Sequence, residues 1–109
     1  MADNKLIISC FKPIPDLTQN TVLIACPIMI HNYGLSYYLE GFQYLLSAYP
    51  HLNLALAIPA QDDVGLALKA LESGVKVVYF DRHTTAWSQL ITMAATYEAE
   101  VRDQGELYD

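Results

Sequence analysis

Between Thr21 and Asp81 the sequence alternates short apolar runs with segments of helical periodicity, and this alternation restricts the fold more than any other feature. Each apolar run has the length of a strand and is bounded by proline, glycine or polar turn residues. Strands that alternate with helices are typical of βαβ units, in which neighbouring strands run parallel. The alternation therefore predicts an α/β fold, Rossmann-like or flavodoxin-like, with two or three layers.

Three parallel strands and three helices are expected along the chain. The strands cover about residues 21–29, 52–58 and 75–80, and the helices cover about residues 33–49, 62–73 and 85–103. In the first helix, apolar side chains recur at the i, i+3, i+4, i+7 spacing of a core-facing helix. Asn32 is the expected N-cap of this helix, and Thr84 or Thr85 is the expected N-cap of the last one.

A further β-prone run covers about residues 5–11 and precedes a connector that contains two prolines. A parallel crossover takes a dozen or more residues, and this connector is judged too short for one. The extra strand is therefore expected to pair antiparallel or to lie at an edge of the sheet. An edge strand is also a place where a second chain can join.

The length of 109 residues suits a single α/β domain over residues 1–109, with residues 104–109 as a frayed tail. No apolar run reaches the roughly 18 residues of a membrane span, and the first residues lack the pattern of a signal peptide. Cys10 and Cys26 have no neighbouring cysteine at metal-ligand spacing and are expected to be reduced thiols. These features predict a cytoplasmic protein that does not contact membranes.

The formal net charge is −6, and the lysines and arginines are scattered along the chain. A surface that follows the phosphates of duplex DNA or RNA needs clustered positive charge, so duplex nucleic acid is not an expected partner. A small anionic ligand remains compatible with this composition, because backbone N–H groups can bind it.

Polar residues gather where the three predicted parallel strands end, and ligands of open α/β sheets bind outside these carboxyl ends. The expected ligand-binding residues are His31, Asn32, Gln61, Asp81 and Arg82. We therefore expect a small soluble α/β binding module that takes a small ligand, anionic or nucleotide-like. Loops at these positions also carry capping residues in α/β proteins generally, so a purely structural interpretation stays open.

The same loops allow an interpretation as a small hydrolase or transferase. His31 or His83 would act as general acid or base, and Asp81 would orient it. These three residues do not lie at the short fixed spacings that are typical of metal ligands, so no metal site is predicted. The loops contain neither a GxGxxG fingerprint nor a P-loop, and the sequence indicates no particular cofactor.

The helix expected over residues 33–49 carries small residues and tyrosines beside its core face. They are Gly34, Tyr37, Gly41, Tyr44 and Ala48. Small residues permit close approach of a second helix, and tyrosine is frequent at interfaces, so we expect self-association through this surface. An adaptor or structural role through the same helix is a further alternative. Packing of Tyr37 and Tyr44 beneath the N-terminal segment would also explain the pattern.

Overall fold

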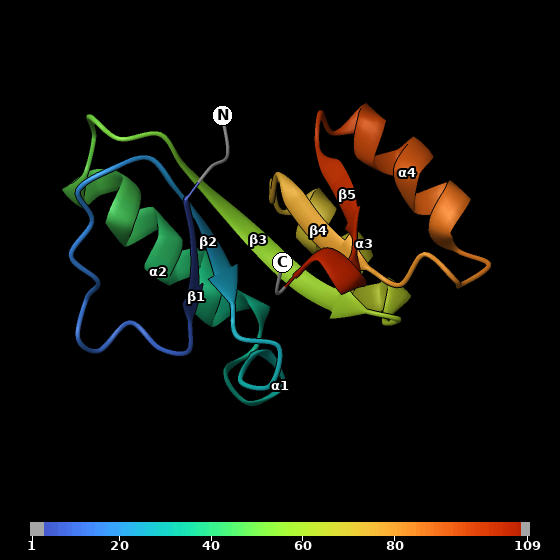
Figure 1. Cartoon of the computed structure of the whole chain (residues 1–109), viewed down its shortest axis with the longest axis horizontal. Coiled ribbons are helices and arrows are strands. Elements are labelled where there is room, and N and C mark those ends of the chain that lie inside the picture. Colours follow the sequence, from blue (N-terminus) through green and yellow to red (C-terminus); the bar gives the residue numbers. More distant parts are fainter. Residues whose placement is uncertain (1–3, 108–109) are drawn as a thin grey trace. The chain divides into compact units, whose positions relative to one another are not determined.

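The computed structural model describes residues 4–107 (Figure 1). Its strands form a parallel sheet in the order β1-β2-β3-β4-β5. The predicted α/β class is confirmed, with five strands in place of three parallel strands and one extra. The chain divides into two compact units, Met1–Leu56 and Ala57–Asp109, and the single domain expected from the sequence stays a prediction.

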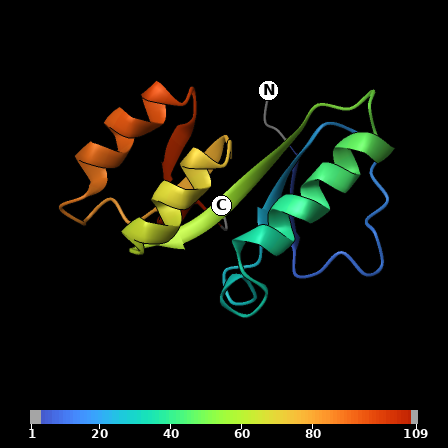
Figure 2. The same cartoon turned by 180° about the vertical axis from the view of Figure 1, so that it is seen from behind.

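The elements of the first unit are β1 (Asn4–Ile8), β2 (Thr21–Ala25), α1 (Ile30–Tyr33) and α2 (Leu35–Ala48). Every residue of β2 is buried, as its continuous apolar run requires, and α2 covers one face of β1 and β2 (Figure 2). β2 is shorter than the strand predicted over 21–29. The Cys26 amide still donates to Ile8 O at 2.9 Å, but the next residue, Pro27, has no N–H with which to continue the ladder.

β1 lies at the edge of the sheet, as expected, but the antiparallel pairing is wrong, because β1 runs parallel to β2 with Ile8 beside Ala25. Residues 9–20 make the crossover without a helix. Three tyrosine hydroxyls of the helical segment hold this connector in place. Tyr37 Oη accepts from Phe11 N at 2.8 Å, Tyr38 Oη donates to Ser9 O at 2.7 Å, and Tyr49 Oη accepts from Leu17 N at 3.2 Å. Side-chain anchoring thus replaces the crossover helix.

The helix expected over 33–49 is interrupted near its start. Gly34 has φ +83°, a left-handed value that favours glycine, and it separates α1 from α2. Asn32 lies inside α1, so its expected role as an N-cap is wrong. The residue that flanks α2 at its N-terminus is Gly34, which has no side chain to cap the helix.

The second unit contains the end of β3 (Leu54–Gln61) followed by α3 (Val64–Glu72), β4 (Val77–Phe80), α4 (Trp87–Thr96), β5 (Glu100–Asp103) and the 3-10 turn η1 (Gln104–Glu106). Asp63 Oδ1 accepts from Leu66 N at 3.1 Å and caps α3, and Gly74 ends this helix with φ +91°. The core includes Ile58, Leu71 and Phe80, which are fully buried.

The last helix is shorter than the predicted 85–103 because the chain reverses after Thr96. Glu98 takes a left-handed φ of +55°, and the residues that follow return as β5, parallel to β4. Neither Thr84 nor Thr85 is the N-cap of α4, which is Ala86. Of the tail expected to fray, Gln104–Glu106 form η1 and Leu107 is buried. The helices in the described part of the chain are too short or too polar to cross a bilayer.

Candidate functional site

In the second unit, β3 and β4 end side by side, and a main-chain hydrogen bond joins their ends. Asp81 N donates to Gln61 O at 2.7 Å, directly after the last residues of the two strands. The register of β3 shifts between Pro59 and Gln61, and Gln61 takes a left-handed φ of +57°. Bulges of this kind change the direction of side chains at the end of a strand. The irregularity therefore brings two of the predicted ligand-binding residues, Gln61 and Asp81, next to each other.

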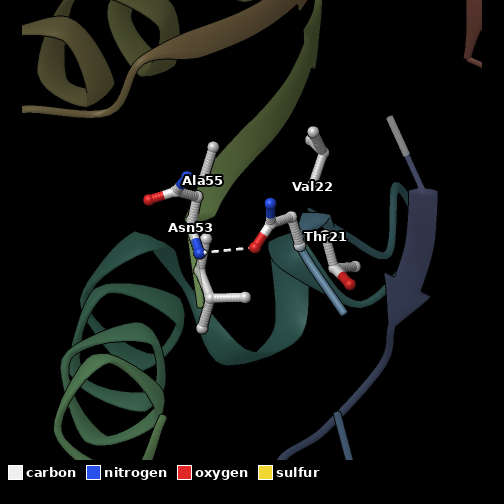
Figure 3. A pocket seen from close by; sticks show the side chains of 6 residues that line it. Thr21, Val22, Asn53 and Ala55 are labelled. Atoms are coloured by element: carbon white, nitrogen blue, oxygen red, sulfur yellow. Dashed lines mark hydrogen bonds between the residues drawn. The ribbon is translucent and has the colours of Figure 1, made fainter. Parts of the chain in front are cut away.

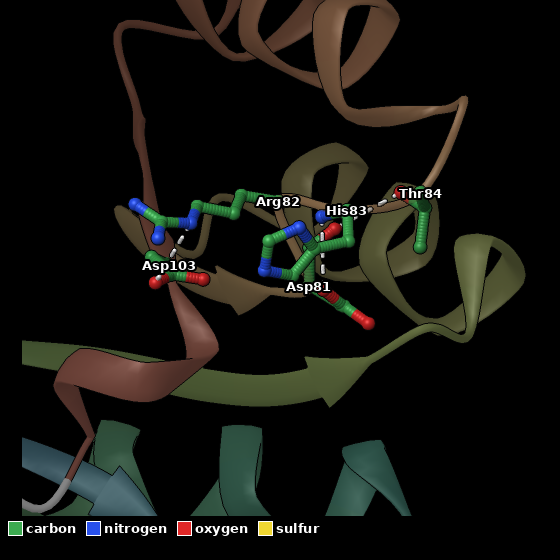
Figure 4. A network of polar contacts seen from close by, with 5 residues as sticks. All are labelled: Asp81, Arg82, His83, Thr84 and Asp103. Atoms are coloured by element: carbon green, nitrogen blue, oxygen red, sulfur yellow. Dashed lines mark hydrogen bonds and ion pairs between the residues drawn. The ribbon is translucent and has the colours of Figure 1, made fainter.

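The loop after β4 is closed by Asp81 (Figure 4). Its Oδ1 accepts from the main-chain N of His83 at 2.9 Å. Its main-chain O accepts from both N and Oγ1 of Thr84, at 3.2 and 3.0 Å. Aspartate commonly orders turns in this way, by accepting from an amide two residues later. The described contact of the Asp81 carboxylate is thus with the main chain of His83, and this contact fixes the shape of the loop.

Arg82 points toward the end of β5, where its Nε lies 3.7 Å from Asp103 Oδ2 (Figure 4). The Arg82 side chain is 61% exposed and that of Asp103 is 25% exposed, so this ion pair adds little stability. Its consequence is positional, because it holds the guanidinium beside the ends of β4 and β5. Asp103 was not among the predicted site residues because β5 was not predicted from the sequence. β5 has four residues, one exposed and three half-buried, and so short a strand without alternation leaves too weak a signal in the sequence.

Charge at these strand ends is mixed. Carboxylates occur at Asp62, Asp63, Asp81 and Asp103; Arg82 pairs with Asp103, and Arg102 in β5 pairs with Glu100. Asp63 is occupied as the cap of α3. Such an arrangement suits a ligand that carries both hydroxyl groups, which donate to carboxylates, and one anionic group, which pairs with the guanidinium.

The other predicted site residues lie in the first unit. His31 and Asn32 are exposed residues of α1, and Asn32 Nδ2 makes a weak contact with Met29 Sδ at 3.8 Å. In the second unit a main-chain hydrogen bond joins Gln61 and Asp81, whereas the side chain of Arg82 is directed to Asp103 on the β5 side. The grouping of His31 and Asn32 with these three stays a prediction.

The surface predicted for self-association is partly covered within its own chain. A Cβ added at Gly41 would lie 2.6 Å from Phe11 Cζ, so the ring of Phe11 occupies the groove that this glycine opens. Tyr37 stacks on Tyr33 at 4.4 Å between ring centroids and accepts from Phe11 N. Packing beneath the N-terminal segment, the alternative considered for Tyr37, is therefore present. Of the predicted interface, Tyr44 (58% exposed) and Ala48 are exposed.

These strand ends present hydrogen-bonding side chains and the Arg82 guanidinium to solvent. Within residues 4–107, no group of three or more His, Cys, Asp and Glu side chains is arranged to hold a metal ion. Comparison with models of known protein families finds no match to this chain, and comparison with curated proteins finds no similar sequence.

Proposed function

We propose that this chain is a small binding module, Rossmann-like or flavodoxin-like in arrangement, that takes a small nucleotide-like ligand at the carboxyl ends of β3, β4 and β5. The ligand carries an anionic group and hydroxyls. The observation that supports this most is the position of Arg82, which is exposed to solvent and held through Nε beside Asp103 at the end of β5. Carboxyl ends of parallel strands are the usual ligand positions in open α/β sheets.

Each residue of this site has a distinct role in the proposal. Arg82 pairs with the phosphate or carboxylate of the ligand, because its planar fork matches two oxygens of such a group. Gln61, which is exposed, offers an amide donor and acceptor. Asp81 orders the loop through the hydrogen bond of its Oδ1, and its second carboxylate oxygen accepts from a ligand hydroxyl.

Binding is better supported than catalysis. The alternative enzyme requires Asp81 to orient the imidazole of His83, whereas the described hydrogen bond of Asp81 Oδ1 goes to the main-chain N of His83. A general base is normally held by such a partner on its ring nitrogen. We therefore place Asp81 in loop ordering and keep the hydrolase or transferase interpretation as the second choice.

Calorimetric titration with ribose 5-phosphate, AMP, inorganic phosphate and free ribose tests this proposal. Hydrogen bonds to charged groups contribute about 1.5–3 kcal/mol, so Arg82→Ala should weaken binding of the phosphorylated probes by roughly 10- to 100-fold. Arg82→Lys should recover part of this loss, because lysine keeps the charge and loses the fork. The matched control is Lys69→Ala, which removes an exposed cation from the end of α3 and should leave affinity unchanged.

If none of the four probes binds, or if Arg82→Ala binds them as tightly as the wild type, the site is wrong. If free ribose binds as well as ribose 5-phosphate, the anionic group has no role. If the protein converts a bound probe to product and His83→Ala loses this turnover, the alternative function as an enzyme is favoured.

Self-association remains a second proposal, and the outer edge of β1 favours it. Residues Asn4 to Ile7 are all exposed, including Leu6 (37%) and Ile7 (41%), and the strand lies at the edge of a sheet. Exposed apolar edge strands tend to pair with another chain. Sedimentation velocity should show a dimer that Ile7→Lys dissociates and that Ile28→Lys, at an exposed residue outside the strand, leaves intact. A wild-type mass equal to one chain would refute this proposal.

A further inference from the structure

The first unit contains a cavity at the amino ends of β2 and β3, at the end of these strands opposite to their carboxyl ends. Its volume is about 230 Å³, and it is lined by Asn20, Thr21, Val22, Asn53, Leu54 and Ala55. Asn53 and Ala55 lie on one side and Thr21 and Val22 on the other (Figure 3). Here we call it the Asn20–Asn53 cavity. It shares no residue with the site proposed above.

Two hydrogen bonds make the polar wall of this cavity rigid. Asn20 Oδ1 accepts from the main-chain N of Asn53 at 2.8 Å (Figure 3), and Thr21 N donates to Asn53 O at 3.2 Å. The first of these also fixes the orientation of the Asn20 amide, because a main-chain N–H requires the oxygen and not the nitrogen. Nδ2 of Asn20 is therefore held as a donor at the cavity, and the exposed side chain of Asn53 adds a second amide.

Aliphatic side chains form the rest of the lining. Val22 is buried, and Leu54 and Ala55 are half-buried. No lining residue carries a charge. A charged ligand would lose hydration here without a counter-charge, whereas an uncharged ligand with a hydrogen-bonding edge would lose little. The volume corresponds to that of roughly seven water molecules at ~30 Å³ each, which suits a single six-membered ring with its substituents.

We propose that the Asn20–Asn53 cavity binds an uncharged cyclic amide of the size of a pyrimidine base. One edge of such a ring carries a donor and an acceptor side by side. The Asn53 amide, which no described hydrogen bond engages, presents the complementary pair, as asparagine does when it recognises the edge of a base in nucleic acids, and Asn20 Nδ2 adds a further donor. The face of the ring packs against Val22 and Ala55. The two asparagines therefore determine the orientation of the ring, and the aliphatic wall favours a ligand that is as thin as a flat ring.

Titration of the ¹⁵N-labelled full chain with uracil, followed by NMR, tests the proposal. The side-chain NH₂ resonances of Asn20 and Asn53 should shift with saturation in the millimolar range. Orotate is the matched probe, because it is uracil with one added carboxylate, and it should bind at least tenfold more weakly. Benzene, which has the ring without the amide edge, should leave the asparagine NH₂ resonances unshifted.

Three variants assign the site. Ala55→Leu fills the cavity and should abolish the shifts. Asn53→Ala removes an exposed amide that no described hydrogen bond engages, so the variant folds, and affinity for uracil should fall by about fivefold, the equivalent of one neutral hydrogen bond. Gln43→Ala removes an exposed amide from α2 and should change nothing. The proposal is refuted if uracil shifts neither asparagine, if orotate binds as well as uracil, or if Asn53→Ala keeps full affinity.

Discussion

Replacing Gly41 with alanine tests how closely the connector of residues 9–20 packs on α2. In the interior of an exposed helix this substitution stabilises by about 0.5–1 kcal/mol, because glycine is the more flexible residue in the unfolded chain. At Gly41 the added Cβ would lie 2.6 Å from Phe11 Cζ and closer still to Cε2. Carbon atoms pack best at about 3.5–4.0 Å, so the ring has to move by roughly 1 Å or more.

Phe11 cannot move freely. It is 6% exposed, and its main-chain N donates to Tyr37 Oη at 2.8 Å. Overpacking of a core contact costs about 1–3 kcal/mol, which exceeds the gain in helix propensity. We therefore expect Gly41→Ala to lower the free energy of unfolding by about 1–2 kcal/mol, a shift of the urea midpoint of roughly 0.5–1 M for a small protein.

Gly65 provides the matched control, because it also lies in a helix, near the start of α3. Its added Cβ would meet Asp63 Oδ1 at 3.4 Å, which is ordinary contact. Gly65→Ala should therefore stabilise by up to about 1 kcal/mol. Urea unfolding followed by far-ultraviolet circular dichroism measures both variants. In the Phe11→Ala background the penalty at Gly41 should vanish, since the atoms that it meets are gone.

The reasoning is refuted if Gly41→Ala and Gly65→Ala change stability by the same amount. It is also refuted if the penalty at Gly41 persists without the Phe11 ring. Either result would mean that the connector does not lie against α2 at this glycine.

Two further predictions concern buried tyrosine hydroxyls. Burial, with smaller contributions from Cys26 and Tyr37, raises the pKa of Tyr38 from 10.0 to about 12. The unfolded chain therefore loses this proton first, so the contribution of Tyr38 to stability is fully present below pH 10 and falls by up to about 2–3 kcal/mol as the pH rises from 10 to 12. Urea unfolding at each pH should show this additional fall in the wild type relative to Tyr38→Phe. Tyr79 Oη is fully buried and makes no well-aligned hydrogen bond among the described residues, although it lies near the Arg102 guanidinium and helps to raise the pKa of that group. Tyr79→Phe should therefore change the melting temperature little, and a drop of several degrees would show that the contact with Arg102 stabilises the fold.

The α/β class and most of the secondary structure could be predicted because they follow from periodicity. The continuous apolar runs at β2 and β4 require strands that are covered on both faces, and both are completely buried. Asp63 and Gly74 bound α3 through chemistry that is local to a few residues. Such signals are legible in a sequence because they do not depend on distant contacts.

Errors occurred where a distant contact decides the local structure. β5 exists because residues after Glu98 can pair with β4, and nothing within Glu100–Asp103 by itself indicates a strand. Asp103 could not be assigned to the candidate site for the same reason. The other residues of the candidate site, Gln61, Asp81 and Arg82, could be proposed from the sequence because they lie within a few residues of the predicted strand ends.

By itself the sequence determined where apolar faces and strand ends lie, because hydrophobic burial follows the period of each segment. The tertiary structure alone decided how those faces are occupied. Residues 9–20 connect β1 to the parallel strand β2 without a helix. They can do so because the hydroxyls of Tyr37 and Tyr49, far along the chain, accept hydrogen bonds from main-chain amides of this connector. The ring of Phe11, from the same chain, fills the groove that Gly41 leaves on α2. A buried main-chain group needs a hydrogen-bond partner, and a groove in the core needs a side chain that fills it. The hydrophobic period of a segment does not identify the residue that provides either one.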